Sequence, residues 1–309
     1  NSETEGLFTS IDWVDINAGE FYYRARERKL GDNFSIRDMF HIPLNKRGIV
    51  STQRYSSLGY PCLYLGNSIY SCWEEMRRPA FNNLMFSAYK VRNPFRDFDM
   101  RIPGDSDYFP DRLIQTIRRI PLVLACGFVV NNYRDVFKPE YIISQLLLDT
   151  IICDSRRRTQ REKSVIDLDV IWGVLYTSTH ISDDFPYGKH LLENIVLPVI
   201  ESNKSSNHCY YLASLFDISK PSCYEYESLK ENTSRMFWDT IDEEKTASEK
   251  VRQQYAQSKL GYLEERLKTA QFETLPHIMV GCPTDGITLD WTGSPVCVEV
   301  RSNEHFIIE

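Results

Sequence analysis

The sequence predicts a globular protein of mixed strands and helices that carries an additional region at its C-terminal end. Short apolar or alternating runs recur between residues 20 and 216, and some of them have helical spacing. From about Ser222 the chain changes to acids mixed with aromatics, followed by a charged helix. We therefore expect an N-terminal arm at residues 1–20, a main domain at 21–221 and a C-terminal extension at 222–309.

Charge and hydropathy argue against two kinds of partner. The net charge of −7, from 36 basic and 43 acidic residues, argues against a protein that binds nucleic acid by neutralising phosphates. The basic cluster at residues 156–163 is expected to form a solvated loop. No apolar run approaches the roughly 18 residues that a membrane span requires. We therefore expect neither nucleic acid nor membrane as a partner.

Cysteine and histidine usage predicts neither a disulfide framework nor a metal site. The eight cysteines are scattered without a CxxC pair, and several lie in apolar runs such as residues 123–130. This pattern is typical of buried, reduced thiols in a cytoplasmic protein. The six histidines have no paired spacing. His41, between Phe40 and Ile42, is expected to be a packed, hydrogen-bonded residue rather than a catalyst.

The first clear strand is expected at residues 20–26. A period of two places Arg24 and Arg26 on the same face of this strand. Either arginine could reach a ligand, but for Arg26 we favour the alternative of a salt bridge on the sheet surface.

Residues 54–75, RYSSLGYPCLYLGNSIYSCWEE, are expected to hold the chemistry of the chain. Turn-forming residues divide this stretch into a short apolar strand at 61–65 and a helix at 68–77. Asn67 or Ser68 is the expected N-cap of the helix. The segment therefore reads as a turn, a strand and a helix in close succession.

Four side chains of this stretch suit an enzyme that binds a dinucleotide and breaks a glycosidic bond. Arg54 precedes the strand and could bind phosphate through two parallel hydrogen bonds. Tyr64, near the end of the strand, offers a ring and a hydroxyl. Glu74 or Glu75 in the helix could stabilise a developing positive charge. The alternative is ordinary: a surface arginine, a core tyrosine and an exposed acidic pair.

Downstream, further strands and helices surround a second candidate position. Ser178 directly follows a buried strand expected at 170–177, a usual place for a functional side chain. The helix at 139–152 carries Ile142, Ile143, Leu146, Leu147 and Thr150 at helical spacing and is expected to bury this stripe against a sheet. The other expected elements are strands at 84–91, 95–100, 194–199 and 210–216 and a helix at 111–119.

The extension is expected to contain one charged helix at 246–272. A narrow apolar seam runs along it, formed by Ala256, Leu260, Leu263, Leu267 and Ala270. We favour packing of this seam on its own domain, because two heptads are too few for a free coiled coil. A homo-oligomer formed through the seam is the alternative. Residues 287–308 are expected to form short strands around a turn at 291–295.

The stretch at 54–75 resembles the RES domain family, which is named for an Arg, a Glu and a Ser. Three further segments carry the resemblance in the family's order, FYYRAR at 21–26, YIISQLLLDTI at 141–151 and GVLYTST at 173–179. The similarity spans about residues 21 to 215. The family is known as the toxin half of bacterial toxin–antitoxin pairs whose members consume NAD or transfer its ADP-ribose.

The resemblance implies a fold and a set of roles. The fold would be α+β, with a split mixed sheet like that of the ADP-ribosyltransferases, flanking helices and an α/β C-terminal extension. NAD would be the substrate, with no metal. Arg24 and Arg54 would hold the pyrophosphate, Tyr64 would stack on or orient the nicotinamide-ribose end, and Ser178 would bind the amide or ribose. Among the acids, Glu75 matches the family's spacing best and Glu74 second.

The resemblance leaves three functions open. The first is an NAD glycohydrolase or phosphorylase acting as a bacterial toxin, and the second is an ADP-ribosyltransferase that modifies a protein. The third is a catalytically silent binding or scaffold module. Tyr55, which follows Arg54, is an additional candidate for contact with NAD. An Xre-type antitoxin protein is the partner that the family implies.

Overall fold

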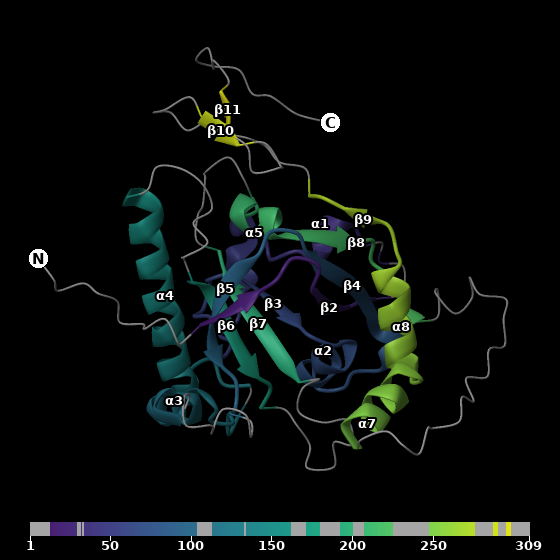
Figure 1. Cartoon of the computed structure of the whole chain (residues 1–309), viewed down its shortest axis with the longest axis horizontal. Coiled ribbons are helices and arrows are strands. Elements are labelled where there is room, and N and C mark those ends of the chain that lie inside the picture. The colour runs from purple at the N-terminus through teal and green to yellow at the C-terminus, as the bar shows by residue number, and fades with distance from the viewer. Residues whose placement is uncertain are drawn as a thin grey trace, which may run out of the picture.

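In the computed structural model, the described part of the chain forms strands and helices arranged around one large sheet (Figure 1). The described residues are 13–29, 32, 34–103, 113–132, 134–161, 171–179, 192–199, 207–224, 247–275, 287–289 and 295–297. None of the described helices is long and apolar enough to span a lipid bilayer.

A nine-stranded mixed sheet forms the centre, with strand order β1-β5-β6-β7-β3-β2-β4-β8-β9. Only β5 and β6 are parallel neighbours; the other described neighbours are antiparallel. The strands are β1 (Trp13–Ile16), β2 (Phe21–Glu27), β3 (Cys62–Gly66), β4 (Leu84–Val91), β5 (Phe95–Met100), β6 (Ile171–Thr177), β7 (Glu193–Pro198), β8 (Phe216–Ser219) and β9 (Phe272–Glu273). Strands β10 (Ile287–Leu289) and β11 (Pro295–Cys297) form a separate antiparallel pair.

The sheet is nearly divided between β2 and β3. β2 pairs with β4 along its whole length, and β3 pairs with β7 along its whole length. Between β2 and β3, however, a single pair joins Tyr23 to Gly66. The α+β class is therefore confirmed, and the mixed sheet consists of two well-paired halves that meet at one point.

Helices cover the two faces of the sheet unequally. One face is covered by α1 (Ile36–Met39), α5 (Tyr210–Leu215) and the short 3₁₀ turn η1 (Leu44–Ile49). On the other face, α3 (Leu113–Cys126) and α4 (Ile142–Arg161) pack on β5 and β6, with η4 (Pro139–Tyr141) leading into α4. α2 (Ile69–Glu75) and α8 (Lys259–Lys268) pack on β2 and β4, with η2 (Phe81–Asn83) and α7 (Ala247–Ala256) beside them.

Most of the predicted elements are confirmed to within two residues, including the strands that became β2 to β7 and the helix that became α2. The predicted seam also packs on the chain's own sheet, since Leu263 and Leu267 are buried against the β2–β4 half. β9 then follows α8 and pairs with β8, so residues 247–275 complete the same sheet.

Four predicted elements differ from the structure in type or extent, α4 among them. The strand predicted at 210–216 is mostly helix α5, because its short apolar run suits a buried helical turn as well as a strand. The helix predicted at 246–272 is two helices, separated where Ser258 caps α8 by accepting from the Gly261 amide at 3.2 Å. α3 extends to Cys126, with Pro121 inside it.

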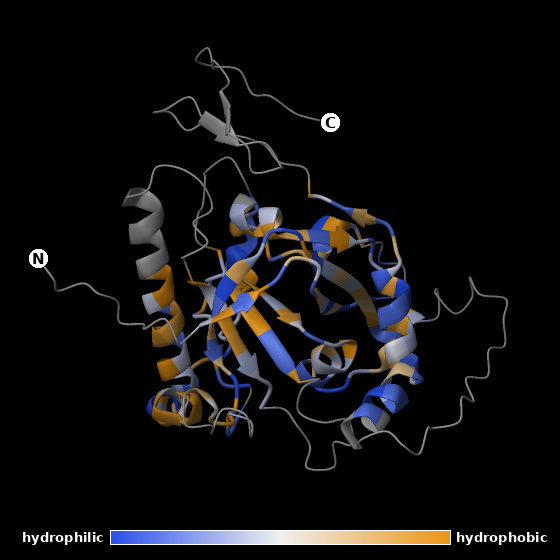
Figure 2. Cartoon of the chain, in the orientation of Figure 1, coloured by the Kyte–Doolittle hydropathy of each residue, from blue (hydrophilic) through white to orange (hydrophobic). Residues whose placement is uncertain are grey.

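α4 differs from its prediction in two ways. It continues to Arg161, so the part of the basic cluster at 156–161 is helical, in keeping with the good helix propensity of Arg and Gln. The predicted buried stripe is also rotated. Leu147, Leu148, Ile151 and Ile152 are buried against the sheet, whereas Ile142, Ile143 and Leu146 are 41%, 43% and 56% exposed. Figure 2 shows the apolar residues of α3 and α4.

Two carboxyl groups on alternate positions of β5 have opposite electrostatic surroundings. Asp99 accepts from Arg101 Nε at 3.0 Å and pairs with Arg119 at 2.9 Å. Burial raises its pKa, but the two arginines outweigh burial and the net shift is downward. Asp97 is fully buried, and neither carboxyl oxygen has a hydrogen-bond partner in the described part of the chain. Burial raises its pKa well above the usual value.

We predict that Asp97→Asn stabilises the protein at neutral pH while Asp99→Asn destabilises it. The raised pKa of Asp97 means that its stabilising contribution is complete below about pH 4 and is lost as the pH rises toward its folded-state pKa. Removing the buried charge should therefore raise the free energy of unfolding at pH 7.5 by about 1 to 3 kcal/mol, and by little at pH 4. Urea unfolding at both pH values measures this. An Asp97→Asn protein less stable than wild type at pH 7.5 would contradict it.

Candidate functional site

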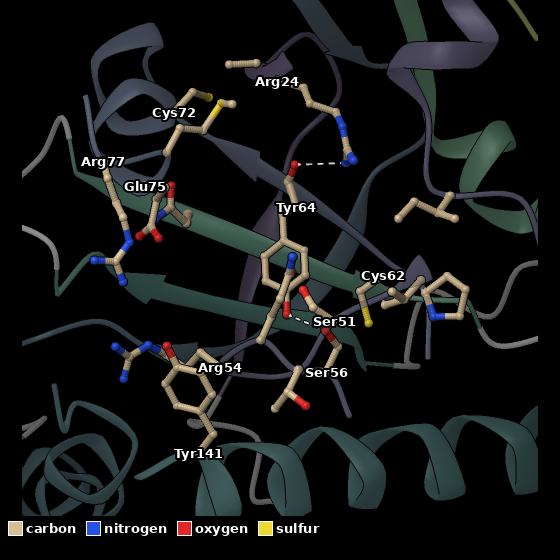
Figure 3. A pocket seen from close by; sticks show the side chains of 18 of the residues that line it. Arg24, Ser51, Arg54, Ser56, Cys62, Tyr64, Cys72, Glu75, Arg77 and Tyr141 are labelled. Atoms are coloured by element: carbon tan, nitrogen blue, oxygen red, sulfur yellow. Dashed lines mark hydrogen bonds between the residues drawn. The ribbon is translucent and has the colours of Figure 1, made fainter. Parts of the chain in front are cut away.

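A cavity of about 780 Å³ opens where the two halves of the sheet separate (Figure 3). Its lining comes from β2, the loop before β3, β3 itself, the end of α2, residues 134–141, and single residues of β6 and β7. Five of the seven predicted or alternative contact residues on these segments line it: Arg24, Arg26, Arg54, Tyr64 and Glu75. The cavity thus brings together side chains that are far apart in the sequence.

Glu75 is fixed at the pocket by two hydrogen bonds to the same carboxylate oxygen. Ser178 Oγ and Asn194 Nδ2 each donate to Glu75 Oε1 at 2.7 Å. Glu75 is the last residue of α2, which ends here because Arg77 and Arg78 adopt left-handed φ angles of 65° and 54°. The helix end and the two donors together determine the direction of the carboxylate.

Ser178 lies behind this carboxylate rather than on the cavity surface. Its side chain is 1% exposed, it is not among the residues that line the pocket, and its amide donates to the Leu192 carbonyl at 2.7 Å. The predicted position at the end of a strand is correct, since β6 ends at Thr177. In this arrangement Ser178 can hold Glu75 in place.

Asn194 is a pocket residue that the sequence did not reveal. It joins α2 to β7, because its Oδ1 accepts from Ser71 Oγ at 2.5 Å while its Nδ2 donates to Glu75. Asn194 is 3% exposed. The available signal was one amide side chain within the apolar strand predicted at 194–199, because a polar side chain there must find buried partners.

Glu74 points away from the cavity. It is 4% exposed and binds Arg78 through contacts of 2.7 to 2.9 Å, and it does not line the pocket. The Trp73 indole beside it donates to the Pro79 carbonyl at 2.8 Å. Of the two acids left open by the sequence, Glu75 is the one placed at the cavity.

Arg24 lines the cavity as a half-buried cation without an acidic partner among the described residues. Its Nη1 donates to the Tyr64 carbonyl at 3.3 Å, across the gap between β2 and β3, and its Nε has no hydrogen-bond partner. Burial lowers its pKa, but a guanidinium stays protonated in proteins. An anion bound in the cavity would give Arg24 the negatively charged partner that the described residues do not provide.

Arg26, on the same face of β2, is engaged differently. Its Nη1 donates to the Asp38 carbonyl, and its guanidinium lies 5.9 Å from the centre of the Phe34 ring. Arg26 also lines the cavity. The predicted surface salt bridge is replaced by a carbonyl contact, since no ion pair involves Arg26 within the described ranges.

Arg54 is 7% exposed and is held firmly by the surrounding chain. Its Nη1 donates to the carbonyls of Cys126 and Phe128 at 2.6 and 3.0 Å, and its Nη2 donates to Thr179 Oγ1. The guanidinium lies 5.2 Å from the centre of the Tyr141 ring. Arg54 therefore links the end of α3, the end of β6 and the end of η4 while presenting positive charge to the cavity.

The two tyrosines proposed from the sequence have different positions. Tyr64 lies between Arg24 on one side and Arg54 and Glu75 on the other (Figure 3), and its hydroxyl donates to Ser56 Oγ at 3.1 Å. Burial raises the pKa of Tyr64, so its hydroxyl is a hydrogen-bonding group rather than a base. Tyr55 is 2% exposed, packs on Tyr176 at 4.8 Å between ring centres, and does not line the cavity.

His41 is a packed structural residue, as predicted. It is fully buried, its Nε2 accepts from the Cys209 amide at 2.8 Å, and its Nδ1 lies 2.8 Å from the Ile42 carbonyl. Burial lowers its pKa to about 3, so it is neutral near pH 7. The cysteines whose burial is described are unpaired thiols, and all except Cys153 are buried. No group of His, Cys, Asp or Glu side chains suited to a metal ion occurs among the described residues.

Comparison with known proteins finds a relative whose name describes its function. The chain is 34% identical over 248 residues to a protein of Bacillus subtilis (strain 168) described as "Putative toxin YopC". The match covers 74% of this chain and 51% of that protein, so the chain spans about half the length of the curated relative that it matches. No family model matches the chain, and no solved structure matches it.

We predict that Arg24 binds anions in the cavity. Inorganic pyrophosphate or ADP should raise the melting temperature of the protein, because either anion would form an ion pair with Arg24. Arg24→Gln should weaken this binding by about 10- to 100-fold, the equivalent of one lost charged hydrogen bond. Calorimetric titration of both anions measures the change.

Arg26→Gln is the matched control, since its guanidinium is already bound by the Asp38 carbonyl. It should weaken binding by no more than about threefold, which is within 0.7 kcal/mol. Equal losses in the two variants would show that the cavity attracts anions through its general charge and not through Arg24.

Proposed function

We propose that the protein cleaves the bond between nicotinamide and ribose in NAD and acts as a toxin by consuming NAD. The observation that carries this proposal is that one cavity holds both Arg24, a cation with no acidic partner among the described residues, and Glu75, a carboxylate fixed by two hydrogen bonds. A cavity of about 780 Å³ is within the range of small-molecule sites. The similarity to a protein named as a toxin supports the biological part of the proposal.

The charged groups suit the two ends of a dinucleotide. The pyrophosphate would lie against Arg24 and Arg54, whose guanidinium groups bind phosphate oxygens in pairs. The nicotinamide-ribose would lie between Tyr64 and Glu75. Arg54 needs no large movement for this role, because its contacts to Cys126, Phe128 and Thr179 already fix its orientation.

Bond cleavage at the ribose requires one well-placed negative charge. As the bond from C1′ to nicotinamide breaks, the electron pair leaves with nicotinamide and positive charge develops on the ribose, as in glycoside hydrolysis. Glu75 would stabilise this charge, and Ser178 and Asn194 would keep its carboxylate aimed at the sugar. Nicotinamide leaves as a neutral molecule, so no acid is needed. Water or phosphate would then attack C1′ and lose its proton to solvent.

ADP-ribosyl transfer to a protein would use the same donor site with a different acceptor. The RES resemblance favours NAD in both cases, and the acceptor decides between them. Release of free ADP-ribose, formation of ADP-ribose phosphate, or label on a protein distinguishes the three reactions. Absence of all three at high protein concentration would support a silent binding module instead.

We predict that the protein releases nicotinamide from NAD, with or without phosphate in the buffer, and that Glu75→Gln lowers kcat by about 100- to 1000-fold. KM should change little, because Glu75 acts on charge that develops in the transition state. Chromatographic assay of nicotinamide measures both constants. Glu74→Gln is the control: it disturbs the contact with Arg78 but leaves the cavity carboxylate in place, so kcat should stay within about threefold.

Two results would contradict this prediction. Equal loss of kcat in the two variants would show that the carboxylate at the cavity has no special role. No nicotinamide release in any buffer, together with no labelled protein in a lysate, would exclude the enzyme function altogether.

A further inference from the structure

The N-terminus of α2 is capped largely by the C-terminal part of the chain. The Ile69 amide donates to Glu264 Oε1 at 2.7 Å, and the Tyr70 amide donates to the Tyr255 hydroxyl at 3.4 Å. The next amide, that of Ser71, is capped locally by Ser68 Oγ at 2.9 Å. Because the first amides of a helix lack partners within it, α7 and α8 satisfy two that would otherwise be buried and unpaired.

The two capping side chains are joined to each other. The Tyr255 hydroxyl donates to the same Glu264 oxygen that accepts from Ile69. Glu264 is 9% exposed. The break between α7 and α8 brings this pair together, and Gly261 allows it, because a Cβ there would lie 2.3 Å from the Tyr255 carbonyl. The turn between the helices therefore cannot accept a larger residue without moving the cap.

α2 is so short that capping its N-terminus can affect the position of Glu75 at its C-terminus. It has seven residues and ends at Glu75, so the whole helix is only about 10 Å long, roughly two turns. A helix of this length is marginal without external support. Leu263 and Leu267 of α8 pack in the same cluster as Ile69 and Cys72 of α2, so the two helices form one packed unit.

We propose that Glu264 and Tyr255 are positioning residues for Glu75: by capping α2, the helix pair α7–α8 holds the carboxylate at the cavity. This inference rests on the proposed function for its catalytic consequence. The capping itself stands on the hydrogen bonds and burial alone. Glu264 and Tyr255 do not line the cavity and act only through α2.

The cap also responds to pH. Burial raises the pKa of Glu264 to about 7, opposed by its bonds from Tyr255 and Ile69 and by Lys268, and assisted by Glu265. Tyr23 of β2 and Cys72 of α2 face the same group. A carboxyl with a raised pKa stabilises the fold fully below its unfolded value, near 4.5, and this contribution is lost as the pH rises to about 7. The fold is therefore less stable when the buried Glu264 carboxyl is ionised than when it is protonated.

Hydrogen exchange at single amides tests the capping directly. In Glu264→Ala, the Ile69 amide should exchange at least 10-fold faster than in wild type, while amides of β6 and β7 keep their rates. In Tyr255→Phe, the gain should appear at Tyr70. Glu265→Ala, at an exposed position of the same helix, should change neither. Unchanged exchange at Ile69 and Tyr70 in both variants would overturn the inference.

Glu264→Gln separates charge from hydrogen bonding and serves if Glu264→Ala does not fold. Its amide oxygen can still accept from Ile69, but it cannot titrate. Wild type should lose more melting temperature between pH 5 and pH 8 than Glu264→Gln does, and equal losses would refute the pH response.

Measuring kcat and KM on NAD tests whether the cap affects catalysis. Glu264→Ala and Tyr255→Phe should lower kcat on NAD several-fold with KM nearly unchanged, whereas Glu265→Ala should match wild type. Faster exchange with unchanged kcat would show that the cap does not position Glu75. If wild type releases no nicotinamide, the proposed function fails while the exchange result still decides the capping.

Discussion

The single pair between β2 and β3 is the constraint on which the candidate site depends. If these strands were paired along their length, the sheet would be continuous and no cavity would open between Arg24 and Tyr64. The pairing is confined to Tyr23 and Gly66. A side chain at Gly66 would meet Cys72 Sγ at 3.0 Å and Asn194 Oδ1 at 3.1 Å. Glycine therefore lets α2 and β7 approach β3 closely, which brings Asn194 within reach of Glu75.

The charge that lines the cavity is opposite in sign to the net charge of the protein. The protein has a net charge of −7, yet among the described residues the cavity is lined by six basic and three acidic side chains. The basic residues are Arg24, Arg26, Arg54, Arg77, Arg134 and Lys138, and the acidic residues are Glu27, Glu75 and Asp135. A locally positive cavity on an acidic protein attracts small anions and disfavours a long polyanion, whose other phosphates would meet the negative surface. This distribution suits a compact phosphate-bearing substrate.

Much of the fold could be predicted from the sequence, because most strands and helices carry clear periodicity. Arg24, Arg54, Tyr64, Glu75 and Ser178 were placed at one site by family resemblance. The structure brings the first four to one cavity, and Ser178 lies behind Glu75 and donates to it. The errors have physical causes. Residues 210–216 form too short an apolar run to distinguish strand from helix, and the seam helix breaks at a cap that its periodicity conceals.

Partners that are distant in the chain were beyond sequence reasoning. Asn194 binds Glu75 across 119 positions, and Glu264 binds the Ile69 amide across 195 positions. No local pattern records such pairs. Tyr55 shows the converse: its place next to Arg54 suggested contact with a ligand, but alternation in the loop turns its ring into the core against Tyr176.

Because α2 and its capping residues are far apart in the sequence, the helix is synthesised well before its cap. The described side chains that line the cavity all belong to residues up to Asn194, whereas Tyr255 and Glu264 are made later. Because synthesis proceeds from the N-terminus, a nascent or prematurely ended chain can contain these cavity residues before the residues that cap α2 have been made. The helix that carries Glu75 is completed only when α8 has emerged. A fragment that stops after β8 is in this respect an unfinished site rather than a smaller working one.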